Sequence, residues 1–157
     1  MQLTTKGRYA VTAMLDLASK ESTKPVTLDM ISQRQNISLS YLEQLFAKLR
    51  KASLVKSVRG PGGGYLLNII AEDVNLTQII EAVDENIDLR RCQGLRNCLR
   101  GKQCLSHHLW CEVSDQIRGF LSTRNLQQVI DDYNTNENVL NKNCQKPDTV
   151  REALTIN

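Results

Sequence analysis

Residues 37–46 read Ile37-Ser38-Leu39-Ser40-Tyr41-Leu42-Glu43-Gln44-Leu45-Phe46, and this stretch decides the fold. Its leucines and its phenylalanine recur at helical spacing, so they form one apolar face. Ser38 or Ser40 can cap the helix, and Ser40 with Glu43 matches the capping-box pattern. The opposite face is polar and becomes basic towards Lys51. An apolar face backed by a polar face is typical of an amphipathic helix that packs against a core.

Two more helices are predicted upstream of this stretch. The first has apolar residues at helical spacing from Tyr9 to Ala18 and ends before Lys24-Pro25. Thr27 can cap a short second helix that ends near Asn36, because asparagine tolerates a left-handed turn. A short helix, a tight turn and a helix with a polar outer face form a helix-turn-helix.

A β-hairpin is predicted downstream of the helix-turn-helix. Residues 54–58 and 65–67 are rich in strand-forming side chains, and they are joined by Arg59-Gly60-Pro61-Gly62-Gly63-Gly64. This connection is nearly all glycine and proline, so it cannot be regular structure. It is not a phosphate-binding P-loop, because no Lys-Ser or Lys-Thr follows the glycines. A simple flexible turn is the alternative, but the helix-turn-helix before it favours a wing.

The rest of the chain is predicted to be helical, apart from one cysteine-bearing loop. An amphipathic helix covers about residues 75–85 and the loop covers about 88–104. A long helix follows the loop as far as Leu121, and a short helix is expected around 126–130. From Tyr133 onward the sequence is polar and rich in asparagine, so we expect a disordered tail.

These elements predict a mainly α protein in three parts. Residues 1–70 form a winged helix-turn-helix with a β-hairpin wing, 71–132 a linker helix, the cysteine loop and a long helix, and 133–157 the tail. No apolar run approaches the ~18 residues that a membrane helix needs. The segment 1–6 lacks the apolar region of a secretory signal. We therefore expect a cytoplasmic protein without a membrane partner.

The charge is distributed unevenly along the chain. Residues 1–60 hold ten Lys/Arg against four Asp/Glu, whereas residues 61–91 hold two against six. Residues 92–157 are nearly balanced, with eight against seven. A basic front end next to an acidic middle favours a polyanion as the partner of the front. A solvated, lysine-rich surface would give the same count, so charge alone does not decide.

The predicted recognition helix carries groups that can read base edges in the major groove. Gln44 can pair with adenine, Ser40 can reach several edges, and Tyr41 can contact a thymine methyl or a phosphate. Glu43 is either a filter against wrong sequences or simply the capping-box partner of Ser40. Basic side chains suit phosphates, and Arg59 at the wing suits the minor groove. The predicted DNA contacts are Ser38, Ser40, Tyr41, Glu43, Gln44, Lys48, Arg50, Lys51, Arg59 and Gly60.

Three of the five cysteines form a regular pattern. In a reducing cytosol such a group suits a metal or redox site better than a disulfide framework. Structural zinc sites usually have C-x2-4-C knuckles, whereas the five-residue gaps here favour a loop around an iron–sulfur cluster. Unliganded thiols are the alternative. The cysteines are Cys92, Cys98 and Cys104, spaced C-x5-C-x5-C, with Cys111 after them and Cys144 in the tail as an expected bystander.

The spacing leaves the fourth ligand open. If the long helix begins near Cys104, then His107, His108 and Cys111 all lie near one of its faces. Any of these three could complete a four-ligand set. A histidine ligand must be neutral to bind, which makes a site pH-sensitive and labile, as suits a sensor.

Four motifs together carry a family resemblance. In this order, and over about residues 1–130, they resemble the IscR family, the iron–sulfur cluster regulators among bacterial winged-helix transcription factors. The tail shows no comparable match. The motifs are Leu3-Thr4-Thr5-Lys6-Gly7-Arg8-Tyr9-Ala10-Val11, the stretch 37–46 quoted above, Val58-Arg59-Gly60-Pro61-Gly62-Gly63-Gly64-Tyr65 and Cys104-Leu105-Ser106-His107.

The resemblance implies a nucleoid-associated homodimer that represses, and at some targets activates, iron–sulfur cluster assembly genes. The assembly machinery would donate the cluster, and loss of the cluster would change the DNA preference. Two recognition helices roughly 34 Å apart would read a pseudo-palindromic operator in double-stranded DNA. The implied ligands of one 2Fe–2S cluster per subunit are Cys92, Cys98, Cys104 and His107. The implied dimer contacts on the long helix are Leu109, Val113, Ile117 and Phe120.

Two features depart from the family pattern, and three rivals remain. Cys111 lies outside the family's ligand pattern, and Arg96 and Arg100 make the loop more basic than expected. One rival interpretation is that the protein is a nitric-oxide-sensing relative, and His107 argues against it. An enzyme or electron carrier would leave the helix-turn-helix unexplained, so we expect no enzyme. The third rival is a winged-helix protein with structural zinc.

Overall fold

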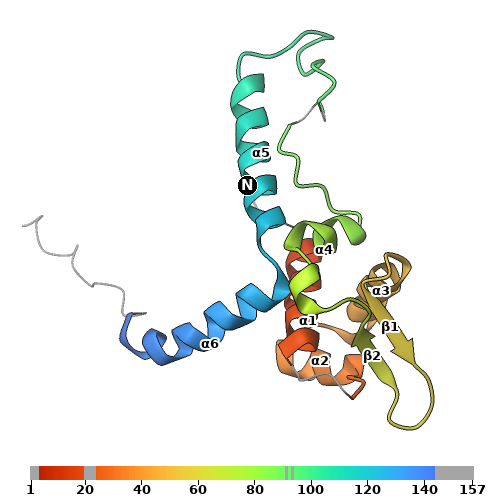
Figure 1. Cartoon of the computed structure of the whole chain (residues 1–157). Coiled ribbons are helices and arrows are strands. Elements are labelled where there is room, and N and C mark those ends of the chain that lie inside the picture. Colours follow the sequence, from red (N-terminus) through yellow and green to blue (C-terminus); the bar gives the residue numbers. More distant parts are fainter. Residues whose placement is uncertain (1–3, 20–23, 91, 93, 144–157) are drawn as a thin grey trace, which may run out of the picture.

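The computed structural model describes residues 4–19, 24–90, 92 and 94–143, with side chains described as far as residue 136. It consists of a winged-helix body and one helix, α5 (His107–Thr123), that projects from this body. Figure 1 shows the cysteine loop at the far end of α5 and the hairpin at the opposite end of the molecule. No helix in the described ranges is long and apolar enough to cross a membrane.

The first two helices form where the sequence predicts them. Helix α1 (Thr5–Ser19) buries Met14 and Leu17, and α2 (Leu28–Gln35) buries Ile31. The Thr27 hydroxyl accepts a hydrogen bond from the Met30 amide at 3.2 Å, which caps α2. Asn36 ends α2 in the left-handed conformation, with φ 52°.

Helix α3 (Leu39–Lys51) is capped by Ser38, one of the two predicted caps, and not by Ser40. The Ser38 hydroxyl accepts a hydrogen bond from the Tyr41 amide at 3.4 Å, and Ser38 is extended, as an N-cap must be. Ser40 lies inside the helix, so the predicted capping box with Glu43 is wrong. Buried Ile37 fixes where the chain enters the helix and so places Ser38, not Ser40, at the cap. The buried side chains of α3 are Leu42, Leu45, Phe46 and Leu49.

The wing is an antiparallel hairpin of β1 (Val55–Val58) and β2 (Gly64–Leu67), with Val58 opposite Gly64. Its turn needs glycine at Gly60, where φ is 98°. Gly64 is needed for space, because a Cβ there would lie 2.5 Å from the Val26 carbonyl oxygen. That close approach allows paired backbone hydrogen bonds between Val26 and Tyr65, which tie the wing to the helical body.

The remaining helices complete the same hydrophobic core. After the short η1 (Ala71–Asp73) come α4 (Leu76–Ala82), α5 and α6 (Leu126–Asn143). The α4 and α6 segments meet through backbone hydrogen bonds, one from the Leu76 amide to the Arg124 carbonyl and one from the Leu126 amide to the Val74 carbonyl, both 3.0 Å. The core side chains contributed by this half are Val74, Leu76, Ile79, Val83 and Leu126.

Three bounds of the structure bear on the predictions. The hydrophobic core that contains α1 also includes residues of α4 and α6. The long helix begins at His107, three residues after Cys104, near which the sequence placed its start. Residues 133–143 are helical, where the sequence predicted a disordered tail, because no glycine or proline interrupts α6 and the Thr135 hydroxyl donates to the Asp131 carbonyl. The remainder of the tail, with Cys144, lies outside the described residues.

Candidate functional site

The outer face of α3 and the wing form one exposed surface. The face opposite this surface is buried in the core, so the body presents α3 outward with the wing beside it (Figure 1). Neither element is covered by another described segment at these positions. The exposed members of the predicted DNA face are Ser38, Ser40, Glu43, Gln44, Arg50, Lys51, Arg59 and Gly60.

Two predicted DNA contacts lie on the flank of α3, not on its outer face. The half-buried Tyr41 packs edge-to-face against Tyr9, with ring centroids 5.9 Å apart. The Lys48 ammonium lies 2.7 Å from an Asp84 carboxylate oxygen, at the end of α4. Sequence spacing alone could not separate this flank from the outer face, because Lys48 and Lys51 lie close together along the helix.

Glu43 is an exposed carboxylate on the outer face of α3. Because Ser38 caps the helix without it, the structural explanation for Glu43 is removed. In the described part of the chain, Glu43 also forms no ion pair that would tie it to a cation. Its role as a filter against wrong base pairs stays a prediction.

Asp16 is a buried ion-pair partner that the sequence reasoning missed. Its side chain is only 3% exposed. It accepts hydrogen bonds from Arg34 Nε at 3.0 Å and from Gln35 Nε2 at 2.6 Å. These contacts hold the end of α2 against α1 and so orient the helix that precedes α3. A carboxylate between Leu15 and Leu17 was the available signal, but its partner is remote in sequence.

A cluster of cysteine and histidine side chains lies at the far end of α5. The His107 ring is 4% exposed and its Nδ1 lies 3.5 Å from the Cys92 sulfur and 3.5 Å from the Cys98 sulfur. The ligand atoms of these three residues all lie within 4.8 Å of one another. The structure therefore brings two predicted cysteine ligands and one histidine together.

Cys104 lies beside this group but outside the tight trio. Its amide donates to the Cys98 sulfur at 3.2 Å, and its own sulfur lies 3.7 Å from the Ser106 hydroxyl. A cavity of about 260 Å³ is open to all three cysteines and His107. The cavity lining is completed by Leu89, Arg90, Ser106 and Trp110.

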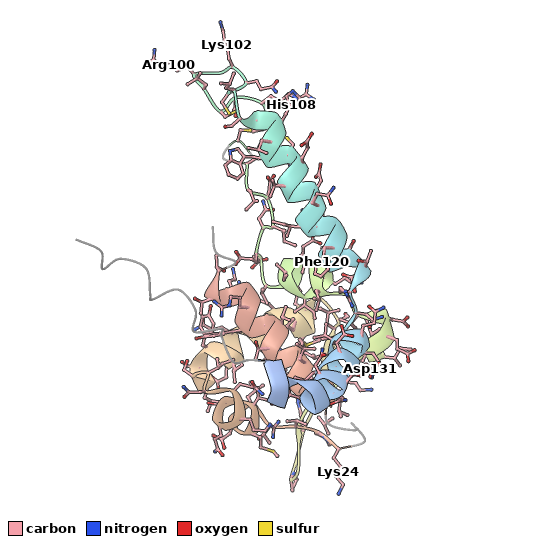
Figure 2. The ribbon with its side chains drawn as sticks, turned by 90° about the vertical axis from the view of Figure 1, so that its left-hand side faces the viewer. Lys24, Arg100, Lys102, His108, Phe120 and Asp131 are labelled. Atoms are coloured by element: carbon pink, nitrogen blue, oxygen red, sulfur yellow. The ribbon has the colours of Figure 1, made fainter. Side chains whose placement is uncertain are left out.

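The other two candidate ligands face elsewhere. His108 is exposed, and Figure 2 shows it near the tip of the molecule with Arg100 and Lys102. The Cys111 sulfur lies 3.8 Å from a guanidinium nitrogen of Arg90 and does not line the cavity. His107, the first residue of α5, lies against the loop cysteines, whereas the His108 ring packs edge-to-face on the His107 ring, with centroids 6.0 Å apart, and does not line the cavity.

Two of the thiols are biased towards the thiolate form. Burial opposes ionisation of Cys92, but amide donors at Gly94 and Arg96 outweigh it, and the pKa of Cys92 is lowered. A hydrogen bond from the Cys98 thiol lowers the pKa of Cys104. The Cys104 amide favours the thiolate of Cys98, but burial and the neighbouring thiols prevail, and the pKa of Cys98 is raised. Thiolates are the form of cysteine that binds metals.

The start of the ligand loop is fastened to α5. The Leu89 amide donates to the buried Ser114 hydroxyl at 3.0 Å. The carboxylate of Asp88, 7% exposed, accepts from Arg90 Nε at 2.7 Å and from Arg90 Nη2 at 2.6 Å. His107 is the first residue of α5. The cavity therefore lies between His107 and the start of the loop, which is hydrogen-bonded to the same helix through Ser114.

Comparison with known proteins identifies the family. The profile of the Rrf2 family, described as iron-dependent transcriptional regulators, matches residues 3–132. The chain belongs to the Rrf2 family. It is 53% identical over 154 residues to the HTH-type transcriptional regulator IscR of Pectobacterium atrosepticum, covering 98% of this chain and 92% of that one. The IscR of Photorhabdus laumondii is 57% identical over 130 residues, covering 83% of this chain and 79% of that one.

Solved Rrf2 structures share the fold. IscR of T. potens superposes with a TM-score of 0.70 at 37% identity, over 85% of this chain and 88% of that chain. CymR, the global cysteine regulator of B. subtilis, superposes with a TM-score of 0.72 at 33% identity, over 83% of this chain and 97% of that chain. These comparisons confirm the predicted winged helix and the IscR resemblance. This Rrf2 protein is a DNA-binding transcriptional regulator, and its relatives are named as regulators, not as enzymes.

Proposed function

We propose that this regulator binds one 2Fe–2S cluster per subunit through Cys92, Cys98, Cys104 and His107, and that the bound cluster changes how it reads DNA. The observation that carries the proposal is the convergence of His107 on two thiols in a cavity that a third thiol also lines. When bound, the cluster supplies an oxidant-sensitive, one-electron redox centre. The genes controlled would be those of cluster assembly, and the assembly machinery would be the cluster donor.

The donor set and the cavity fit this cofactor. Three cysteines and one imidazole are soft and borderline ligands of the kind that iron–sulfur clusters use. The cavity of about 260 Å³ far exceeds the ~10–15 Å³ that one water needs on the same volume measure. His107 must be neutral to ligate through Nδ1.

Structural zinc is the second candidate, and the same trio supports it. Ligand atoms within 4.8 Å of one another can also surround a single tetrahedral ion. Against zinc stand the size of the cavity and the five-residue gaps between the cysteines. Metal and sulfide analysis distinguishes the two candidates directly.

The DNA-binding role rests on α3 and the wing. Gln44 and Ser40 on the exposed face are proposed to contact base edges, Arg50 and Lys51 phosphates, and Arg59 the minor groove. Glu43 is proposed to reject wrong sequences. On such a sequence its carboxylate would be repelled by the phosphates and would find no hydrogen-bond donor on a base, which would weaken binding. Lys48 and Tyr41 are proposed to contact the DNA backbone only after Lys48 breaks its ion pair with Asp84 and Tyr41 breaks its ring contact with Tyr9.

We propose a homodimer that uses the projecting α5. Leu109 and Phe120 on this helix are 55% and 59% exposed, and apolar side chains gathered on one helix face mark a surface that packs against a partner. Together with Val113 and Ile117 they would pack against a second copy of the helix. Two recognition helices about 34 Å apart would then read a pseudo-palindrome.

The first test is to purify the protein without oxygen, record its visible absorption and assay iron and acid-labile sulfide on the same sample. Brown protein with nearly equal iron and sulfide is the expected result. Colourless protein that contains zinc would contradict the cluster and support the second candidate, while leaving the DNA-binding role intact. Metal-free protein would be reconstituted with iron and sulfide, and failure to take up both would also contradict the proposal.

A further inference from the structure

Arg90 and Asp88 form a rigid ion pair where the ligand loop begins. The guanidinium donates twice to the Asp88 carboxylate, at 2.7 and 2.6 Å, and the Arg90 amide donates to the same carboxylate at 2.8 Å. The Asp88 side chain is 7% exposed and the Arg90 side chain is 26% exposed. Three hydrogen bonds to one buried carboxylate fix the direction in which the guanidinium lies.

Of the two residues in the pair, Arg90 lines the cavity together with the three cysteines and His107, and Asp88 does not. One guanidinium nitrogen lies 3.8 Å from the Cys111 sulfur, and the guanidinium also lies within 3.5 Å of the Cβ position at Gly94. The cation therefore sits between the loop and α5, at the wall of the candidate cluster site.

We propose that Arg90, held in place by Asp88, sets the reduction potential of the cluster bound in this cavity. The inference rests on the proposed function. Reduction adds one electron to a site that already holds up to three thiolates, so it adds negative charge to an anionic group. A fixed cation at the wall favours this added charge and raises the potential. The electron comes from an external reductant, and no covalent bond forms or breaks.

Two substitutions should shift the potential in opposite directions. Arg90→Gln removes the cation and leaves the buried Asp88 carboxylate, so the cluster becomes harder to reduce. Asp88→Asn removes the carboxylate and leaves the cation, so the cluster becomes easier to reduce. A pair with a merely structural role would loosen the loop in both variants and shift them the same way. Arg90→Lys keeps the charge but loses the two-pronged contact, so its potential should lie between those of the wild type and Arg90→Gln.

The expected shift is about tenfold in the ratio of reduced to oxidised protein at a fixed applied potential. A tenfold change corresponds to about 59 mV for a one-electron couple. This size is what a unit charge roughly 10 Å away produces at an effective dielectric constant of about 20.

The experiment is an anaerobic redox titration of each reconstituted full-length variant with dithionite, followed by visible absorption and circular dichroism. Arg100→Gln is the matched control, because Arg100 is an exposed cation of the same loop that does not line the cavity. We expect the reduction potential to be lower in Arg90→Gln, higher in Asp88→Asn, intermediate between Arg90→Gln and the wild type in Arg90→Lys, and close to the wild type in Arg100→Gln.

Equal potentials in Arg90→Gln and the wild type would overturn the inference, as would shifts of the same sign in Arg90→Gln and Asp88→Asn. If Asp88→Asn fails to fold, the contrast between Arg90→Gln and Arg90→Lys decides: equal shifts in these two would overturn it. A wild type that binds no cluster would overturn the proposed function as well, so the two failures are distinguishable.

Discussion

The ammonium of Lys48 lies 2.7 Å from a carboxylate oxygen of Asp84. Lys48 belongs to the recognition helix, and Asp84 follows the C-cap of α4, where the chain turns towards the cysteine loop. The Asp84 carbonyl also accepts from Lys6 at 3.2 Å, and the Thr4 hydroxyl donates to Glu85. The corner at the start of the loop is thus tied to both the DNA-binding helix and the start of α1.

We predict that Asp84→Asn strengthens DNA binding, because Lys48 is then free to contact a phosphate. An exposed ion pair contributes only about 0–1 kcal/mol, so the gain in affinity should be at most about fivefold. The slope of log affinity against log salt should become steeper by about 0.9 for each added phosphate contact. Fluorescence anisotropy with labelled DNA at several salt concentrations measures both quantities.

Glu81→Gln is the control for this experiment. Glu81 also carries an exposed ion pair on α4, but its partner is Arg118 on α5, away from α3. Unchanged affinity and slope in Asp84→Asn, or equal changes in the two variants, would show that Lys48 does not reach DNA.

We predict that Ser38→Ala destabilises the protein by about 1 kcal/mol, because it removes the cap of α3. Ser40→Ala should cost much less, since Ser40 is the second residue of the helix, does not cap it and is exposed. Urea unfolding followed by circular dichroism compares the two. The reverse order of stabilities would mean that the helix begins at Ser40.

We predict that Glu43→Ala weakens discrimination between operator and unrelated DNA while leaving stability unchanged. The carboxylate is exposed and takes no part in the cap of α3. Losing it should raise affinity for mismatched sites more than for the operator, by a discrimination of about 1–3 kcal/mol per base pair read. A panel of operators with single substitutions tests this, and an equal change on every site would contradict the filter role.

We predict that His107→Ala loses the cluster during anaerobic gel filtration, whereas His108→Ala keeps it. The Nδ1 of His107 lies 3.5 Å from two cysteine sulfurs, while His108 is exposed next to it. Iron and sulfide retained per subunit is the measurement. Equal retention in the two variants would exclude His107 as the ligand that holds the cluster.

The sequence predicted those parts of the fold that depend on local pattern. Apolar spacing places α1 and α3, Asn36 ends α2, and the glycine run around Gly60 forms the wing turn. The cysteine spacing indicated a metal or cluster loop, and the structure brings Cys92, Cys98 and His107 together there. Each of these signals lies within one element or one connection.

The features that the sequence did not predict depend on contacts between distant segments. Asp16 is buried because Arg34 and Gln35 approach it from another helix. Asp84 reaches Lys48 only because α4 folds back onto α3. The fourth ligand could not be chosen from spacing, since the choice depends on where α5 begins.

The most direct test of cluster-dependent DNA recognition compares operator affinity between cluster-loaded wild type and Cys92→Ala under anaerobic conditions. The operator would be selected from random DNA with the loaded wild type, and affinity measured by anisotropy at one fixed salt concentration. Coupling of the usual size predicts that Cys92→Ala binds this operator about 5- to 150-fold more weakly, while both proteins bind unrelated DNA alike. Equal affinity of the two proteins for the selected operator would contradict the account.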